Sequence, residues 1–199
     1  MARPRSFDVD DALVAATQVF LARGFDGATL DDLTGAMGIN KPSLYAAFGD
    51  KEALYAKVLE GYAAMAKSAM ESAFDAGDTL EHAGRRLLAG AIEVYAPAKG
   101  NRLGCLIATT ATTAAGSNPA VRAVLATFLS DVDQLIRTAI KRRFGGDLAD
   151  ANIASVADVL SAAMYSIAIR ARAGASRRQL SAIAERAVAT MGVIARTAA

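Results

Sequence analysis

The segment Gly38–Leu54 constrains the fold most strongly, because it contains two helix starts close together. Asn40 is suited to cap a helix, and Pro42 is tolerated in the first turn, where its missing N–H would have no partner. Gly49 can end that helix, and Asp50 can cap the next one. The sequence therefore predicts a short helix over about 41–48, followed at once by another helix.

The rest of the sequence predicts an all-α fold. Aromatic residues make up 6% of the chain, few β-branched residues alternate with polar ones, and Ala, Leu, Arg and Glu are abundant. Apolar periodicity and capping residues delimit nine helices in two domains, 1–50 and 51–199. The predicted helices are 8–23, 30–37, 41–48, one that starts after residue 50, 79–96, 103–115, 119–144, 152–173 and 176–196.

Composition limits the class of protein. The chain has 199 residues, 53% of them hydrophobic, which is enough for one typical domain and a small one. A single cysteine provides neither an internal disulfide nor a Cys-based zinc site, which fits a reducing cytoplasm. The longest uncharged run, 103–121, holds four Thr, Ser, Asn, Pro and two Gly. We therefore expect no signal peptide, no membrane segment and a cytoplasmic location.

The sequence lacks the usual parts of an enzyme active site. It contains one histidine, and it has no His/Cys/Asp cluster with metal-ligand spacing, no GxGxxG, no Walker-type loop and no HExxH motif. We expect a protein that is not an enzyme and that holds no metal or cofactor.

Helices 30–37 and 41–48 are joined by a turn of the size and composition found in helix-turn-helix motifs. In the second helix, Leu44 and Phe48 can pack inward, which leaves a small and polar N-terminal half suited to a DNA major groove. No acidic residue occurs between Leu33 and Gly49, although residues 1–51 carry five Lys/Arg and seven Asp/Glu, a net charge of −2. DNA binding would therefore depend on where charges lie, because the whole chain carries a formal charge of only +2.

Lys51 occupies the first position of the helix that follows Asp50. A phosphate could dock between its ammonium and the free backbone N–H groups of that helix start. Taken alone, such a lysine is usually solvated, and a lone Tyr45 is more often a packing residue. The combination of these features is less common than either one alone.

Residues 7–55 resemble the TetR/AcrR-type transcriptional regulators. The pattern of that family is a Thr-capped helix, a Gly turn, Leu-Tyr-x-His-Phe and Lys-Glu-x-Leu, and it is matched by Thr29, Gly38, Leu44-Tyr45, Phe48 and 51–54. The sequence departs from the pattern at Ala47, where the family usually has His, and at Met37, where it usually has a small residue.

The resemblance implies a role for individual residues on DNA. It implies that Thr29, Tyr45 and Lys51 hold phosphates, and that Lys41, Pro42 and Ser43 approach base edges. Arg3 and Arg5 flank Pro4 ahead of the first helix. Such an arm could reach a minor groove or the DNA backbone, and the alternative is a disordered tail.

In this family the C-terminal region dimerises and holds an effector pocket. Residues 56–199 resemble it mainly through length, helical content and the sequence Gly104-Cys105-Leu106. We expect the last two helices to form a four-helix interface in a homodimer, although their apolar stripes could equally be internal core. The expected interface residues are Leu160, Met164, Ile167, Ile183, Ala187 and Met191.

The effector pocket is expected among helices of the second domain. Threonine hydroxyls there could meet a ligand, or they could bond back to carbonyls one turn earlier, and the apolar candidates could be plain core. The expected ligand-binding residues are Tyr95, Cys105, Thr109, Thr113, Phe128 and Tyr165.

Together with these features, the resemblance implies a homodimeric transcriptional regulator, expected to be a repressor because repression is usual in the family. It would bind a palindromic operator in double-stranded DNA and be released by an unknown small-molecule effector. The alternative is a helical protein-interaction module that has lost specific DNA binding, which Ala47 and the negative charge of the first quarter of the chain favour.

Overall fold

The computed structural model describes residues 7–75, 79–101, 103–146 and 148–197, and this part of the chain is all-α. Its helices are α1 (Val9–Gly27), α2 (Leu30–Met37), α3 (Lys41–Phe48), α4 (Lys51–Asp75), α5 (Leu80–Tyr95), α6 (Thr112–Ala114), α7 (Pro119–Phe144), α8 (Asp150–Arg172) and α9 (Arg177–Arg196), with a π-helical turn η1 (Ile107–Ala111) before α6. The predicted arm residues Arg3 and Arg5 lie outside the described residues.

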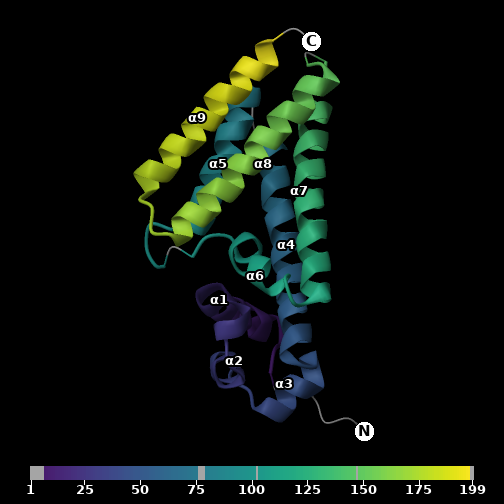
Figure 1. The fold of residues 1–199 in the computed structure, drawn as a ribbon, viewed down its shortest axis with the longest axis vertical. Coiled ribbons are helices and arrows are strands. Elements are labelled where there is room, and N and C mark those ends of the chain that lie inside the picture. Colours follow the sequence, from purple (N-terminus) through teal and green to yellow (C-terminus); the bar gives the residue numbers. More distant parts are fainter. Residues whose placement is uncertain (1–6, 76–78, 102, 147, 198–199) are drawn as a thin grey trace.

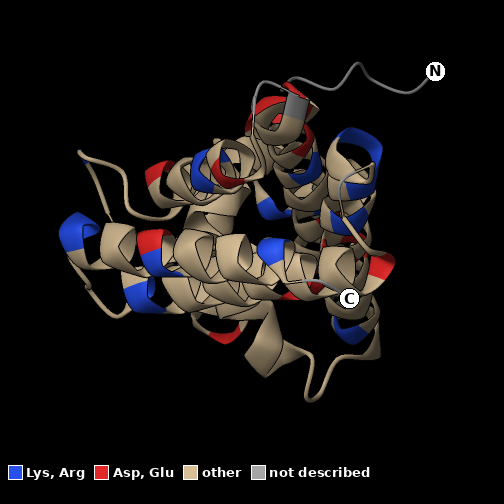
Figure 2. Cartoon of the chain, turned by 90° about the horizontal axis from the view of Figure 1, so that it is seen from above, with Lys and Arg blue, Asp and Glu red and all other residues tan. Residues whose placement is uncertain are grey.

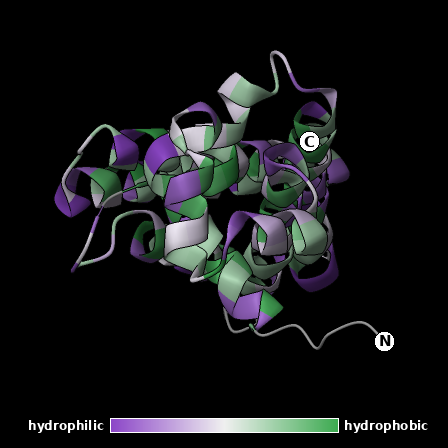
Figure 3. Ribbon diagram, turned by 90° about the horizontal axis from the view of Figure 1, so that it is seen from below, coloured by the Kyte–Doolittle hydropathy of each residue, from purple (hydrophilic) through white to green (hydrophobic). Residues whose placement is uncertain are grey.

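The molecule has two tiers, which α4 joins (Figure 1). Helices α1–α3 and the first turns of α4 form a small tier at one end, and α5–α9 pack around the rest of α4. The hydrophobic core continues through both tiers, with Phe20 and Leu44 buried in the small one and Leu88 and Ile136 in the large one. Seen from the end that carries α2 and α3, hydrophobic and hydrophilic positions alternate around the helices (Figure 3).

Local hydrogen bonds start most helices where the sequence predicted. The Thr29 hydroxyl accepts a bond from the Asp32 N–H, and the Asp32 carboxylate accepts one from the Thr29 N–H, so the pair forms a capping box. The side-chain oxygens of Asn40 and Asn118 cap α3 and α7 in the same manner. Ser176 completes a second capping box at the start of α9.

The prediction of a helix over 103–115 was wrong at its start, over 103–105, because Gly104 has a φ of 72°. A regular right-handed helix is interrupted by that conformation, as α1 is kinked at Gly24, whose φ is 73°. The Gly104 N–H donates to the Tyr95 carbonyl at 3.2 Å, and an added Cβ would lie 2.4 Å from the Ala168 carbonyl oxygen. The segment therefore turns sharply against α8, and the helical part starts only after it.

Helix α8 is the one helix in the described ranges that is long and apolar enough to cross a membrane. It packs against α5, α7 and α9, and half of its most apolar window is buried inside the protein. The apolar residues of α8 thus contribute to the core of the larger tier. Lys/Arg and Asp/Glu positions are interspersed over the surrounding helices (Figure 2).

Candidate nucleic-acid interface and effector pocket

Helix α3 is held on the small tier by its two predicted anchors. Leu44 is fully buried and Phe48 is 3% exposed. Gly38 ends α2 with a φ of 65°, a left-handed conformation that glycine adopts without strain, and this turn sets α3 across α2. The arrangement is a helix-turn-helix.

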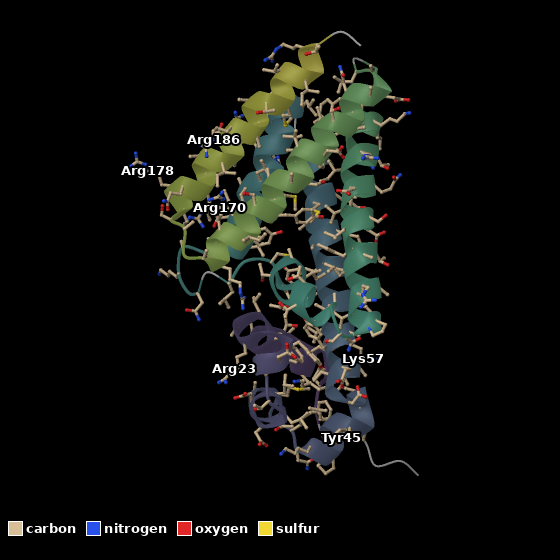
Figure 4. The ribbon with its side chains drawn as sticks, in the orientation of Figure 1. Arg23, Tyr45, Lys57, Arg170, Arg178 and Arg186 are labelled. Carbon is tan, nitrogen blue, oxygen red and sulfur yellow. The ribbon has the colours of Figure 1, made fainter. Side chains whose placement is uncertain are left out.

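The outward side of α3 carries the residues predicted to reach DNA. Lys41 and Pro42 are exposed, Ser43 is half-buried, and the Tyr45 side chain is 50% exposed. Tyr45 lies at the end of the molecule that is farthest from α9 (Figure 4). Thr29 is also exposed on this tier, where its hydroxyl caps α2.

Acidic side chains approach this surface more closely than the sequence suggested. Lys41 Nζ lies 2.8 Å from the Asp31 carboxylate, and this hydrogen bond, followed by the opposite charge, raises the pKa of Lys41. Arg23 pairs with Asp32 at 3.2 Å. Both acids come from the first turn of α2, outside the acid-free stretch between Leu33 and Gly49. Exposed pairs of this kind are weak and break readily, so Lys41 remains available to a stronger anion.

Lys51 already has partners inside the protein. Its ammonium donates to the carbonyls of Phe25 and Ala28, at 3.0 Å each, and lies 4.4 Å from the centroid of the Phe25 ring. These contacts fix the turn between α1 and α2 against the start of α4. An ammonium has three donors, so one is left for a phosphate.

The residues predicted to line one effector pocket are spread over several environments. Phe128 and Cys105 are buried in the core, and Thr113 is exposed. Thr109 donates to the Cys105 carbonyl at 2.6 Å, so it follows the alternative in which threonines bond back by one turn. Tyr95 is the one predicted ligand residue that lines the cavity between α4 and α5.

This cavity between α4 and α5 has a volume of about 340 Å³ and is mainly apolar. Met65 and Val94 line it while being 60% and 56% exposed, so the mouth lies between these two helices. Periodicity alone did not reveal it, because alanines and a glycine on a helix surface give no binding signal. Its lining residues are Tyr62, Met65, Ala66, Ala69, Met70, Ala73, Arg86, Leu87, Gly90, Ala91, Val94, Tyr95 and Met164.

Three tyrosines gather around the single thiol near this cavity. Burial is the main cause that raises the pKa values of Tyr62, Tyr95 and Tyr165 above the ordinary range, and the nearby Cys105 raises all three further. The Tyr165 hydroxyl is buried without a hydrogen-bond partner among the described residues. At neutral pH the three tyrosine hydroxyls are therefore uncharged donors and acceptors.

The six predicted dimer residues face the interior of the single chain. Leu160, Met164, Ile167, Ala187 and Met191 are at most 9% exposed, and Ile183 is half-buried against the same core. The alternative reading of these stripes as internal core therefore describes this chain, since α8 and α9 turn them toward the rest of the larger tier. The opposite faces of α8 and α9 carry exposed residues, among them the apolar Ala162, Ile169, Ala182, Ala189 and Val193 and the charged Arg170, Glu185 and Arg186.

Two polar contacts join the tiers, and sequence reasoning identified neither. Arg172, near the end of α8, donates to the Leu21 carbonyl of α1 at 2.8 Å and to the Leu103 carbonyl at 3.1 Å. The buried hydroxyls of Tyr55 in α4 and Thr110 in η1 lie 2.7 Å apart. Helix α1 is thus tied through Arg172 to the end of α8 and to Leu103, and the start of α4 is tied to η1.

The chain is similar to known bacterial regulators in its first third. Residues 12–58 match the family described as bacterial regulatory proteins, tetR family. Over 60 residues the chain is 47% identical to the HTH-type transcriptional repressor BdcR of Escherichia coli (strain K12), and over 60 residues it is 43% identical to the repressor ComR of the same organism. These matches cover 30% of this chain, 30% of BdcR and 29% of ComR.

A solved structure extends the similarity to nearly the whole chain. A cysteine mutant of the TetR family transcriptional regulator CifR, complexed with a 26-base-pair double-strand operator DNA, is 33% identical to it with a TM-score of 0.85. The match covers 94% of this chain and 98% of CifR. A TetR family regulator from Cytophaga hutchinsonii shares the fold, with 21% identity and a TM-score of 0.79.

Proposed function

Because the chain belongs to the TetR family of bacterial regulatory proteins, we propose that it binds a palindromic operator in double-stranded DNA as a homodimer and represses transcription until a small-molecule effector releases it. The CifR complex with operator DNA supports the DNA partner, and the repressors BdcR and ComR support repression. The proposal implies a cytoplasmic location.

The observation that carries this proposal is the outward side of α3. Its N-terminal half is free of large apolar side chains other than Pro42, and it lies at the tip of the molecule, where a groove can receive it. We propose that Lys41, Pro42 and Ser43 approach base edges. Tyr45, half exposed beside them, and Thr29 would contact phosphates.

In this proposal Lys51 contributes less to phosphate binding than the sequence suggested. Two of its three donors are bonded to the Phe25 and Ala28 carbonyls. It would orient the helix-turn-helix and supply at most one hydrogen bond to a phosphate. The arm with Arg3 and Arg5 remains a proposed contact in the minor groove or on the backbone.

A homodimer would use the outward faces of α8 and α9. Exposed apolar residues lie there, Ala162 and Ile169 on α8 and Ala182, Ala189 and Val193 on α9. The alanines among them would let helices approach closely. The two helix-turn-helix motifs of such a homodimer could contact half-sites about one DNA turn apart.

Release by an effector would act through the two contacts that join the tiers. A ligand near Tyr62 and Tyr95 would lie next to the segment that holds Cys105, and this segment leads directly into η1. A displacement of this segment would move Tyr55 through its hydrogen bond with Thr110, and it would move α1 through the hydrogen bond from Arg172 to Leu21. The ligand lowers DNA affinity to the extent that it binds the altered state more tightly.

The test of the DNA partner is a titration of the purified full chain against fluorescent DNA from its own upstream intergenic region, at several salt concentrations. We expect preference over a scrambled duplex and a steep loss of affinity with salt, because neutralised phosphates release counterions. Equal affinity for both duplexes would reject the regulator and favour the protein-interaction module.

The contact made by Tyr45 is tested in the same titration. Tyr45→Ala should weaken binding to operator and scrambled DNA alike, because a phosphate contact carries no sequence information. Tyr45→Phe separates the hydroxyl from the ring, and neither change should affect folding, because the side chain is half exposed. Unchanged affinity of Tyr45→Ala for both duplexes would remove Tyr45 from the interface.

A further inference from the structure

The cavity between α4 and α5 is kept open by small residues on both helices. Ala66, Ala69 and Ala73 line it from α4, and Gly90 and Ala91 line it from α5. A Cβ added at Gly90 would have no heavy atom within 4 Å, so even this surface glycine borders open space. Such a volume, about 340 Å³, is at the lower end of the range of about 300–1,000 Å³ typical of ligand sites, so the occupant is small.

The walls of the cavity disfavour a charged occupant. Arg86 is the one charged residue in the lining, and it already takes part in an interaction within the protein. Apart from Arg86, the lining offers no charge that could compensate an ionised group for the hydration it would lose there. Three methionines, Met65, Met70 and Met164, add flexible apolar surface that can adapt to the shape of a hydrocarbon.

Two tyrosines are the uncharged polar residues in the otherwise mainly apolar wall of the cavity. Tyr62 and Tyr95 line it, and both lie close enough to Cys105 to interact with it. Tyr95 is only 6% exposed, so it is shielded from bulk water. Tyrosine hydroxyls donate and accept, and they can therefore meet a carbonyl, a hydroxyl or an amine of a ligand.

We propose that the effector of this chain is a small, uncharged and largely apolar molecule with a single hydrogen-bonding group, which enters between Met65 and Val94 and directs that group toward Tyr62 and Tyr95. This proposal rests on the proposed function in one respect, because a bound molecule is an effector only if the chain is a regulator that the molecule releases from DNA. The cavity itself and its selectivity against charge stand independently of DNA binding.

The experiment uses two fluorescent probes that share one scaffold. N-phenyl-1-naphthylamine is uncharged and carries one N–H group, and 1-anilinonaphthalene-8-sulfonate adds a permanent negative charge. Titrated into the full chain, the neutral probe should give a saturable fluorescence increase with one site per chain. Its affinity should exceed that of the sulfonate at least tenfold.

Two matched glycine variants locate the site. Gly90→Leu fills the cavity and should weaken binding of the neutral probe at least tenfold, whereas Gly61→Leu, at an exposed α4 position outside the cavity with equally open surroundings, should change it less than twofold. Leucine favours a helix more than glycine does, so both variants should fold. Tyr62→Phe should weaken the neutral probe several-fold by removing the hydroxyl.

Three results would overturn the proposal: no saturable signal from the neutral probe, sulfonate binding that is as tight, or equal effects of Gly90→Leu and Gly61→Leu. The operator titration of the unmodified chain is a separate measurement. If the chain fails to bind operator DNA but still binds the neutral probe at Gly90, the proposed function fails and the ligand class stands.

Discussion

The Lys51 ammonium fastens the turn after α1 by donating to the Phe25 and Ala28 carbonyls. Lys51→Met keeps most of the aliphatic stem and removes the donors, and it leaves these acceptors without their charged partner. We expect the free energy of unfolding to fall by about 1–3 kcal/mol, the usual cost of losing such a partner. Urea unfolding measures it, and Lys57→Met, at an exposed position of the same helix, is the control.

The same variant separates a structural role of Lys51 from a phosphate contact. If Lys51 mainly binds a phosphate, Lys51→Met should leave the unfolding free energy unchanged and reduce the slope of log affinity against log salt by about one. That outcome would contradict the importance assigned to the two carbonyl contacts.

The buried Tyr55 should make the stability of the protein depend on pH in the alkaline range. Its side chain is fully buried, and burial raises its pKa to about 12, while the hydrogen bond to Thr110 opposes this shift. The folded-state pKa exceeds the unfolded value, so the stabilisation is complete below pH 10 and is lost as pH rises through 12. Two pH units correspond to on the order of 2–3 kcal/mol.

The measurement for Tyr55 is the free energy of unfolding between pH 9 and pH 12. Tyr55→Phe should make the decline over this interval shallower, although Tyr62, Tyr95 and Tyr165 still contribute to it in the same direction. An identical decline in the variant and the original chain would show that Tyr55 ionises as easily in the folded as in the unfolded state.

At the scale of elements, the segment between α5 and α7 departs most from regular structure. Gly104 turns the chain against α8, and η1 follows in place of the first turns of an α-helix. Thr109 and Thr110 bond back to the carbonyls of Cys105 and Leu106 inside this segment. It lies between the cavity and the small tier, so its unusual geometry coincides with the proposed route of release.

Gly104→Ala should destabilise the protein by about 2 kcal/mol or more. The turn would hold the alanine at a positive φ, which a residue with a side chain rarely adopts. The added Cβ would also lie 2.4 Å from the Ala168 carbonyl oxygen. Gly90→Ala, which meets no atom within 4 Å in α5, should leave stability unchanged or raise it. Thermal unfolding measures both, and equal midpoints would show that the turn at Gly104 tolerates a side chain.

At the scale of the whole molecule, the inward and outward faces of α8 and α9 differ in burial. Their inward stripes, which include Leu160 and Met191, fill the core of the larger tier. The outward stripes end in Ile169 and Val193, which are 57% and 60% exposed. Large exposed apolar residues set among alanines are consistent with contact to a second copy.

Val193→Asp should convert the proposed homodimer into a monomer, because two carboxylates would be buried at the interface without a partner. The fold of each chain should survive, since Val193 is exposed within it. Sedimentation measures the mass in solution, and operator affinity should fall with it. Val14→Asp, at another exposed valine on α1, should leave the mass unchanged, and a dimer that persists in Val193→Asp would place the interface elsewhere.

The sequence by itself determined the starts of the helices that have side-chain caps, the helix-turn-helix and its exposed residues. Each of these depends on groups within three or four positions of one another, such as Thr29 with Asp32 or the Asn40 side chain with the Ser43 N–H. Local hydrogen bonds of this kind form wherever the rest of the chain lies, and their residue types are therefore visible in the sequence.

Only the tertiary structure decided which face of a helix turns inward and what fills the space between helices. Leu160, which was predicted to lie in a dimer interface, is buried in the core of the single chain. The Lys51 ammonium donates to the Phe25 carbonyl of α1, and Arg172 donates to the carbonyl of Leu21, 151 positions away in the sequence. An apolar stripe on a helix predicts that this face is buried, but it does not predict which element covers it. A cavity forms only where the side chains of two packed helices leave space between them. These outcomes depend on the packing of distant segments, which no local pattern encodes.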